Sequence, residues 1–280
     1  MIPDASTSIS PASGLHIRPF APEHLADAVR LSRQVGWPHR QQDWAMALAI
    51  SEGVVALNNR RVVGTACCTR FGDVALLNMI IVDEAMRGHG LGRRLIAAAM
   101  DLAPGAEMRL VATTDGLPLY EKLGFHAKYR IVQHQGIART ATARVPVREG
   151  PVQDVTGLVR MDHAASGLDR EALLDRIAAQ GDVLLADRGF AMVRDFGRGQ
   201  VIGPVVARDA ATARALIAEA VRRNAGAFLR IDLPEGAGLS DDVAALGLSC
   251  VGGGTAMVRD PGPSPSGDFT TFALVSQALG

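Results

Sequence analysis

A glycine-rich segment, Arg-Gly-His-Gly-Leu-Gly over Arg87–Gly92, is the clearest chemical feature of the sequence. It follows the apolar run Val74–Val82, which has strand character, and it leads into a helical pattern over Gly92–Leu102. Glycines leave the backbone bare, so successive N–H groups can converge on an anion, and the positive end of a helix dipole strengthens that attraction. Arg87 and Arg93 add full positive charges that suit a diphosphate.

Two common glycine motifs do not describe this segment. It lacks the Gly-Lys-Ser/Thr ending of a P-loop, which disfavours a nucleoside triphosphatase. A dinucleotide-binding motif requires the glycines after the first strand and an acid about 20 positions on. Here the loop follows a predicted hairpin over Val54–Thr69, and the strand end Val111–Thr114 carries no acid.

The stretch Asn78–Arg94 resembles the acetyl-CoA signature of the GNAT N-acetyltransferases, Arg/Gln-x-x-Gly-x-Gly/Ala after a strand. Arg87, Gly90 and Gly92 occupy its fixed positions, and Leu119–Phe125, one predicted strand later, resembles the second motif of the family. The resemblance covers roughly residues 15 to 135. More loosely, the whole chain resembles bacterial GNAT proteins with an appended second GNAT-like domain.

This resemblance implies an acyltransferase that moves an acetyl group from acetyl-CoA to a primary amine by direct attack in a ternary complex. Tyr120 would act as the catalytic acid on the departing thiolate, because a phenol with a pKa near 10 keeps its proton at neutral pH. The amide N–H of Ile80 or Ile81 would polarise the thioester carbonyl. The other cofactor contacts that the resemblance implies are Met79, Val82, Arg87, Gly88, His89, Gly90, Leu91, Gly92, Arg93, Thr113 and Leu117, together with Tyr120.

The acceptor site is less well defined by the sequence. Trp37, in the loop between two predicted helices, and Asp169 are its candidate residues, and the acceptor is a small molecule, an amino acid or a peptide or protein amine. The general base stays open between Glu84, Asp73, His126 and a chain of waters. An alternative function is a catalytically weak acetyl-CoA sensor or partner-binding module, because a fold can outlive its chemistry.

The chain of 280 residues is long enough for two cores, and its order of elements predicts an α/β protein of the α+β type with a mixed sheet. We expect a flexible tail over residues 1–14 and a GNAT catalytic domain over residues 15–145. A smaller, degenerate GNAT-like domain without the glycine loop is expected over residues 150–280. Its apolar end, Phe269–Leu279, is predicted to dock back on the body.

Composition narrows the remaining choices. The 29 basic and 29 acidic residues balance, which argues against a nucleic-acid partner, and no apolar run approaches the roughly 20 residues that span a bilayer. The three cysteines, at positions 67, 68 and 250, fit neither a disulfide framework nor a metal site. We therefore expect a cytoplasmic monomer or homodimer that contacts neither membrane nor nucleic acid and holds no metal.

Overall fold

A computed structural model describes residues 14–139, 146–150 and 155–280 of the chain. The predicted tail over residues 1–14, apart from Gly14, lies outside the described residues. The same is true of the predicted domain end at residue 145.

Strands and helices are interspersed along the chain, with short 3-10 turns before α1, before α3 and before α8. The strands are β1 (Leu15–Pro19), β2 (Glu52–Asn58), β3 (Arg61–Phe71), β4 (Val74–Val82), β5 (Glu107–Ala112), β6 (His126–Ile137), β7 (Arg148–Glu149), β8 (Asp182–Ala186), β9 (Gly189–Phe196), β10 (Gly199–Ala207), β11 (Phe228–Pro234), β12 (Ser249–Arg259) and β13 (Thr270–Ala273). The helices are α1 (Leu25–Gln34), α2 (Gln41–Leu48), α3 (Leu91–Met100), α4 (Leu117–Lys122), α5 (Thr156–Ser166), α6 (Glu171–Ala178), α7 (Ala210–Arg223) and α8 (Ser240–Ala245).

The described strands form one mixed sheet in the order β1-β2-β3-β4-β5-β12-β6-β11-β10-β9-β8-β7, with β13 paired to β10. Most pairs are antiparallel, whereas β4 with β5 and β10 with β11 run parallel. Each half of the chain thus contributes one parallel pair flanked by antiparallel strands. The predicted α/β fold with a mixed sheet is confirmed.

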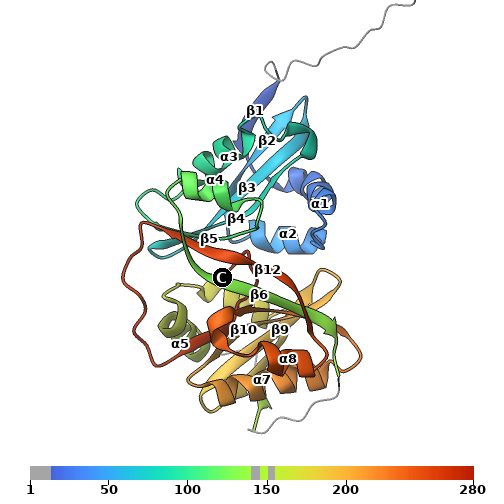
Figure 1. Cartoon of the computed structure of the whole chain (residues 1–280), viewed down its shortest axis with the longest axis vertical. Helices are drawn as coiled ribbons and strands as arrows, with labels where there is room; N and C mark the ends of the chain where they lie inside the picture. Colours follow the sequence, from blue (N-terminus) through green and yellow to red (C-terminus); the bar gives the residue numbers. More distant parts are fainter. Residues whose placement is uncertain (1–13, 140–145, 151–154) are drawn as a thin grey trace, which may run out of the picture.

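The two halves of the chain exchange strands at the centre of this sheet. Strand β12, from the end of the chain, lies between β5 and β6, and β6 pairs on its other side with β11. Figure 1 shows β6 and β12 crossing the middle of the molecule together, between the first half above and the second half below. The division at residues 145–150 stays a prediction, but the central strands of the sheet belong to both halves.

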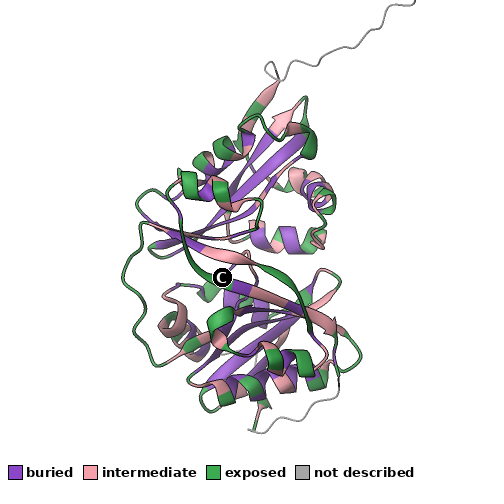
Figure 2. Cartoon of the chain, in the orientation of Figure 1, coloured by how far each residue is buried: buried purple, intermediate pink, exposed green. Residues whose placement is uncertain are grey.

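In the first half, helices cover both faces of the strands. Helix α3 buries Leu91, Leu95 and Ile96 against β2 to β5, at the spacing expected of one helical face. On the opposite face, α1 and α2 pack with a cluster that contains Trp44 and Met79. The strands between these layers are therefore almost fully buried, and the outer helical surfaces are exposed (Figure 2).

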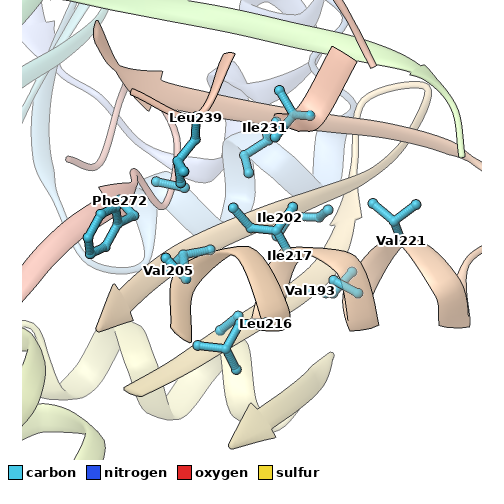
Figure 3. Packing of buried hydrophobic residues seen from close by; sticks show 14 of the residues in the cluster. Val193, Ile202, Val205, Leu216, Ile217, Val221, Ile231, Leu239 and Phe272 are labelled. Carbon is cyan, nitrogen blue, oxygen red and sulfur yellow. The ribbon is translucent and has the colours of Figure 1, made fainter. Parts of the chain in front are cut away.

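In the second half, α7 supplies the largest apolar contact. Leu216, Ile217 and Val221 lie on its buried face, against strand residues that include Val193 and Ile202 (Figure 3). Asp209 begins this helix by accepting a hydrogen bond from the N–H of Thr212 at 2.8 Å, so its first turn is capped.

The C-terminal segment packs onto the body of the molecule. Strand β13 pairs with β10, and the N–H of Leu274 donates to the carbonyl of Asp232 at 2.9 Å. Nearby, the buried guanidinium of Arg170 makes a bidentate pair with Asp162 and donates to the carbonyl of Leu279 at 3.1 Å. Because both charges are buried, each depends on the other for its stability.

Strand β6 is longer than the sequence predicts. The pattern predicts a strand over Ala127–Gln133, whereas the structure extends it to Ile137. Residues 133–137 pair with β11, and residues 133–135 also pair with β12, both more than ninety residues later in the chain. Local periodicity carries no information about that partner.

The close pairing of β12 with β6 predicts that Gly253→Ala is strongly destabilising. Gly253 has φ +155°, and a Cβ there would overlap the carbonyl oxygen of Ile131 on β6. We expect a loss of about 2–4 kcal/mol in the free energy of unfolding, measured by urea titration. Gly157→Ala, whose Cβ would meet nothing within 4 Å, is the control and should be neutral or slightly stabilising. Equal stability of the two variants would contradict the prediction.

Candidate active site

A bulge interrupts β4 opposite β3. Thr65 pairs with Ile81 and Cys67 with Asn78, so Met79 and Ile80 together face one residue of β3. Met79 has φ +51°, which is uncommon for a residue with a side chain, and its carbonyl accepts a 2.7 Å hydrogen bond from the buried hydroxyl of Thr65. This bond holds the backbone in a conformation that costs about 1–3 kcal/mol on its own.

Beyond the bulge, β4 separates from β5. The two strands pair only over Val74–Leu76 and Glu107–Arg109, although β4 continues to Val82. The backbone of β4 past Leu76 therefore has an edge that β5 does not occupy. Such an edge accepts an extended, amide-containing ligand in the way that it would accept another strand.

The glycine loop leaves a row of N–H groups without partners. Among the described residues, no hydrogen bond involves the backbone N–H groups of residues 88–93, and the first intrahelical bond runs from Arg94 N–H to the carbonyl of Gly90 at 3.2 Å. Gly88 and Gly90 have φ of +81° and +73°, and a Cβ at either would meet nothing within 4 Å. The loop therefore presents a row of unpaired donors, with open space beside Gly88 and Gly90, at the start of α3, which suits an anion.

The charged side chains at the two ends of the loop are all positive. Arg87, Arg93 and Arg94 lie at its two ends, and none forms an ion pair with an acid in the part of the chain that the structure describes. His89 binds the carbonyl of Arg87 through Nδ1 at 2.8 Å, so its side chain shapes the turn. Unpaired donors and positive side chains are groups that suit a diphosphate, and the binding of a cofactor at this loop stays a prediction.

Tyr120 lies on α4 with its ring buried and 8% of its surface exposed. The ring packs edge-on against Phe125 at 6.0 Å between centroids. No hydrogen bond is formed by its hydroxyl within the described residues, and burial raises the pKa of Tyr120 to about 12. The group therefore holds its proton at neutral pH and is available as a donor.

Both halves of the chain line a cavity of about 300 Å³. The lining residues from the first half are Gly36, Trp37, Pro38, His39, Leu77, Asn78, Met79, Ile80, Val111, Thr113, Tyr120, Gln133 and Gln135, and those from the second half are Phe196, Arg198, Arg230, Val251, Ser276, Gln277 and Ala278. The structure thus brings Tyr120, Met79, Ile80, Thr113 and Trp37 together around one cavity, as the sequence-based hypothesis requires.

Other predicted site residues lie elsewhere. Asp169 is exposed and pairs with His163 at 2.9 Å, and it does not line the cavity. Leu117 and Val82 pack against the core beside α3, whereas Ile81 is buried beneath α1 and α2. The lining residues include none of the three side chains that the sequence suggested as general bases, Glu84, Asp73 and His126.

Sequence reasoning missed several lining residues. Arg198 and Arg230 carry no local signal, because only the strand exchange places them beside the glycine-loop domain, and Gln133 and Gln135 stand outside both motifs. Asn78 stands within the first motif, but the motif assigns it no role. Its amide NH₂ donates to the hydroxyl of Thr69 at 2.8 Å, and its buried carbonyl oxygen has no partner in the described structure.

His39 follows Trp37 and Pro38 into the cavity wall and is surrounded by aromatic rings. Its ring meets those of Trp37, Trp44 and Phe196 edge-on, and Nδ1 lies 3.2 Å from the hydroxyl oxygen of Ser32. Burial, the main cause, lowers the pKa of His39 to about 4, with a smaller contribution from two nearby arginines. The imidazole is therefore neutral at physiological pH.

Comparison with known proteins identifies the class of protein. Family models described as "Acetyltransferase (GNAT) domain" match residues 50–127 and residues 158–271. An uncharacterised N-acetyltransferase of Bacillus subtilis, YitH, is 29% identical over 92% of this chain and 96% of its own length. Two domains of one family, arranged along a single chain, are therefore present.

Solved structures agree on the fold. A protein of Pyrococcus horikoshii assigned as an acetyltransferase superposes with a TM-score of 0.81 at 22% identity, covering 98% of both chains. A GCN5-related N-acetyltransferase of Sphaerobacter thermophilus gives a TM-score of 0.61 at 17% identity over 90% of this chain and 98% of that one. The chain is an acyltransferase that belongs to the GNAT acetyltransferases and carries two GNAT domains in tandem.

Two further observations bear on the expectations from composition. In the described residues, no helix is both long and apolar enough to cross a membrane. Within the same part of the chain, no three His, Cys, Asp or Glu residues gather in a way that could hold a metal ion.

The environment of His39 predicts an acid-dependent loss of stability. The unfolded chain takes up a proton on His39 near pH 6.5, whereas the folded chain resists it down to about pH 4. Its contribution is therefore complete above pH 6.5 and is lost as the pH falls through this interval. Because His39 is only partly buried, we expect a loss of about 1–2 kcal/mol between pH 7.5 and pH 5.

Urea unfolding of the wild type and His39→Gln at both pH values measures this contribution. The variant should lose less stability between pH 7.5 and pH 5 than the wild type does. Identical pH dependence in both proteins would show that the imidazole is not held neutral by the fold.

Proposed function

We propose that this protein transfers the acetyl group of acetyl-CoA to a primary amine of a small molecule, an amino acid or a peptide. The observation that carries the proposal is the cavity that Tyr120 and the bulged residues Met79 and Ile80 line together. A proton donor and a strained, partly unpaired backbone at one cavity are what acyl transfer from a thioester requires. The name of the Bacillus subtilis relative supports nitrogen as the acceptor atom.

The residues present fit acetyl-CoA as the acetyl donor. GNAT acetyltransferases generally use this cofactor, which supplies the acetyl group as a thioester. The unpaired N–H groups of residues 88–93 and the side chains of Arg87 and Arg93 would hold the pyrophosphate. The free edge of β4, from Met79 to Val82, would bind the pantetheine arm, and Thr113 and Leu117 lie near the turn into α4 that flanks it.

The amine nitrogen forms a bond to the acetyl carbon as the carbon–sulfur bond breaks, so the nitrogen loses a proton and the sulfur gains one. Tyr120 would donate its hydroxyl proton to the leaving sulfur, and its phenolate would regain a proton from the acylated nitrogen through water, while the amide of Ile80 or Ile81 would stabilise the negative charge on the carbonyl oxygen. The cavity lining contains two arginines and no Asp or Glu.

We further propose that the enzyme works in the cytoplasm as a monomer or homodimer. Its three cysteines, Cys67, Cys68 and Cys250, are all free. Burial raises the pKa of Cys67 to about 12, so this thiol is an inert part of the core. A reducing compartment suits a chain with this pattern of free thiols.

The role of Tyr120 predicts a selective loss of turnover in Tyr120→Phe. We expect kcat to fall roughly 100-fold, because the leaving thiolate loses its acid, while the Kd for acetyl-CoA changes less than about threefold. Coenzyme A release and calorimetric titration measure these two quantities. Tyr129→Phe, which removes the hydroxyl of the half-exposed tyrosine on β6, should keep the wild-type kcat. Undiminished turnover in Tyr120→Phe would remove its proposed role.

The glycine loop predicts a complementary loss of affinity. Gly90→Trp should weaken acetyl-CoA binding at least about tenfold in a folded protein, because the side chain fills the space where the pyrophosphate would lie. Gly105→Trp is a matched control, since Gly105 also has positive φ (+76°) and a Cβ at this position would likewise meet nothing within 4 Å. Titration of acetyl-CoA into both variants compares equal backbone strain at two places. Equal affinities would argue against a phosphate site at the loop.

A further inference from the structure

The second half of the chain places a group of positive charges at the cavity. Arg198 in the β9–β10 turn and Arg230 on β11 both line it, and so does Phe196. The guanidinium of Arg230 lies 5.2 Å from the centre of the Phe196 ring, and that of Arg194 lies 5.1 Å from the same ring. The acids Asp and Glu are absent from the lining residues.

The acids nearest to this group already have partners. Asp232 is fully buried and accepts two hydrogen bonds from Arg230, at 3.0 and 3.1 Å. Asp43 pairs with Arg40 and also accepts from the backbone N–H of Gly197 at 3.1 Å. Asp195 is mostly exposed and faces Arg40 at 3.8 Å.

Arg198 differs from its neighbours in having no acid beside it. In the described part of the chain it forms no ion pair and no side-chain hydrogen bond, although it lines the cavity. The turn that carries it is held in place, because the Gly197 N–H is bound to Asp43 and Phe196 packs on the ring of His39. An arginine on an anchored turn with five free donors is suited to bind an anion.

Neutral polar groups complete this end of the cavity. Gln133, Gln135 and Gln277 line it, and the amide NH₂ of Gln277 donates to Gln133 at 3.1 Å and to Asp232 at 2.9 Å. Amide side chains can turn either a donor or an acceptor toward a ligand. They therefore tolerate a carboxylate or a peptide group between the arginines and the reaction centre.

We propose that the acceptor is an amine that also carries a carboxylate, and that Arg198 and Arg230 bind this carboxylate while the amine lies beside Tyr120. The inference rests on the proposed acetyl transfer, and it adds the chemical class of the acceptor. It also assigns a role to the second GNAT domain, which supplies both arginines. The domain without the glycine loop selects the acceptor for the domain that has it.

The sheet order sets the length of this acceptor. Three strands, β5, β12 and β6, lie between β4, which carries Ile80, and β11, which carries Arg230. At about 4.8 Å per strand, the two backbones are roughly 15–20 Å apart, and the arginine side chain spans only part of that distance. The carboxylate must then be several bonds away from the amine. Longer ω-amino acids and short peptides fit better than an α-amino acid alone.

A series of amines of increasing length tests the proposal. We would measure coenzyme A release with glycine, 4-aminobutyrate, 6-aminohexanoate, diglycine and triglycine, each beside the carboxamide of the same compound. A carboxylate bound by a guanidinium is worth about 1.5–3 kcal/mol, so we expect kcat/KM to favour the longer carboxylates over their amides by about 10–100-fold.

Variants locate the preference. Arg198→Gln should lower kcat/KM for the carboxylates to the value for the amides, and Arg198→Lys should restore part of the preference. Arg188→Gln, which removes an exposed arginine from the β8–β9 turn outside the cavity, should behave as the wild type. A wild type that acetylates carboxylates and amides equally, or an Arg198→Gln variant with an intact preference, would overturn the proposal.

A second readout does not depend on turnover. Thermal unfolding of the coenzyme A-loaded protein is measured with the N-acetylated products of the same carboxylates and amides. Stabilisation by the acetylated carboxylates that is lost in Arg198→Gln would support the carboxylate site. If this stabilisation were seen but no amine were turned over, only the proposed acetyl transfer would be contradicted. Turnover of amines without any difference between carboxylates and amides would contradict the carboxylate site and would still support the proposed acetyl transfer.

Discussion

The pairing of β12 with both β5 and β6 is the constraint on which the rest of the molecule depends. Each half of the chain provides a sheet with helices on it, but neither half completes its own sheet at the centre. The exchanged strands bring Gln133 and Gln135 beside Arg230 and carry the second domain to the opening between β4 and β5. The cavity exists because this pairing fixes the two domains relative to one another. A hinge motion between the domains would separate the two walls of the cavity.

Within that frame, small departures from regular structure provide the chemistry. A regular β4 would pair with β5 along its whole length and present no free edge. Here the pairing with β5 ends at Leu76, the bulge at Met79 follows, and the Thr65 hydroxyl donates to the carbonyl of Met79. Similarly, α3 begins at a glycine in the left-handed conformation with no capping side chain, so its first N–H groups stay available. Both features cost stability locally, and the buried cores around α3 and α7 offset that cost.

Local chemistry is predictable from the sequence here, and the assembly of the site is not. Arg87, Gly90 and Gly92 stand close together in the chain, so their spacing alone indicates an anion-binding loop, and a second short motif points to Tyr120. Strand and helix positions are also predicted well where one face is buried, as in α3. By contrast, Arg198 and Arg230 reach the cavity through strand pairings between residues more than ninety positions apart, as Ile131 with Pro234 shows. Asp169, the other candidate for the acceptor site, is exposed, pairs with His163 and does not line the cavity.

The exchange of strands also affects how this chain is made. A ribosome releases β5 and β6 well before β12. Ala112 on β5 therefore has no strand partner until Thr255 on β12 has been synthesised. During that interval the first domain has an unpaired strand edge beside its glycine loop, and such edges attract other chains. Synthesis of the last quarter of the chain thus supplies β12, which pairs with this exposed edge. The segment that completes the active enzyme also ends the period in which the chain is most exposed to aggregation.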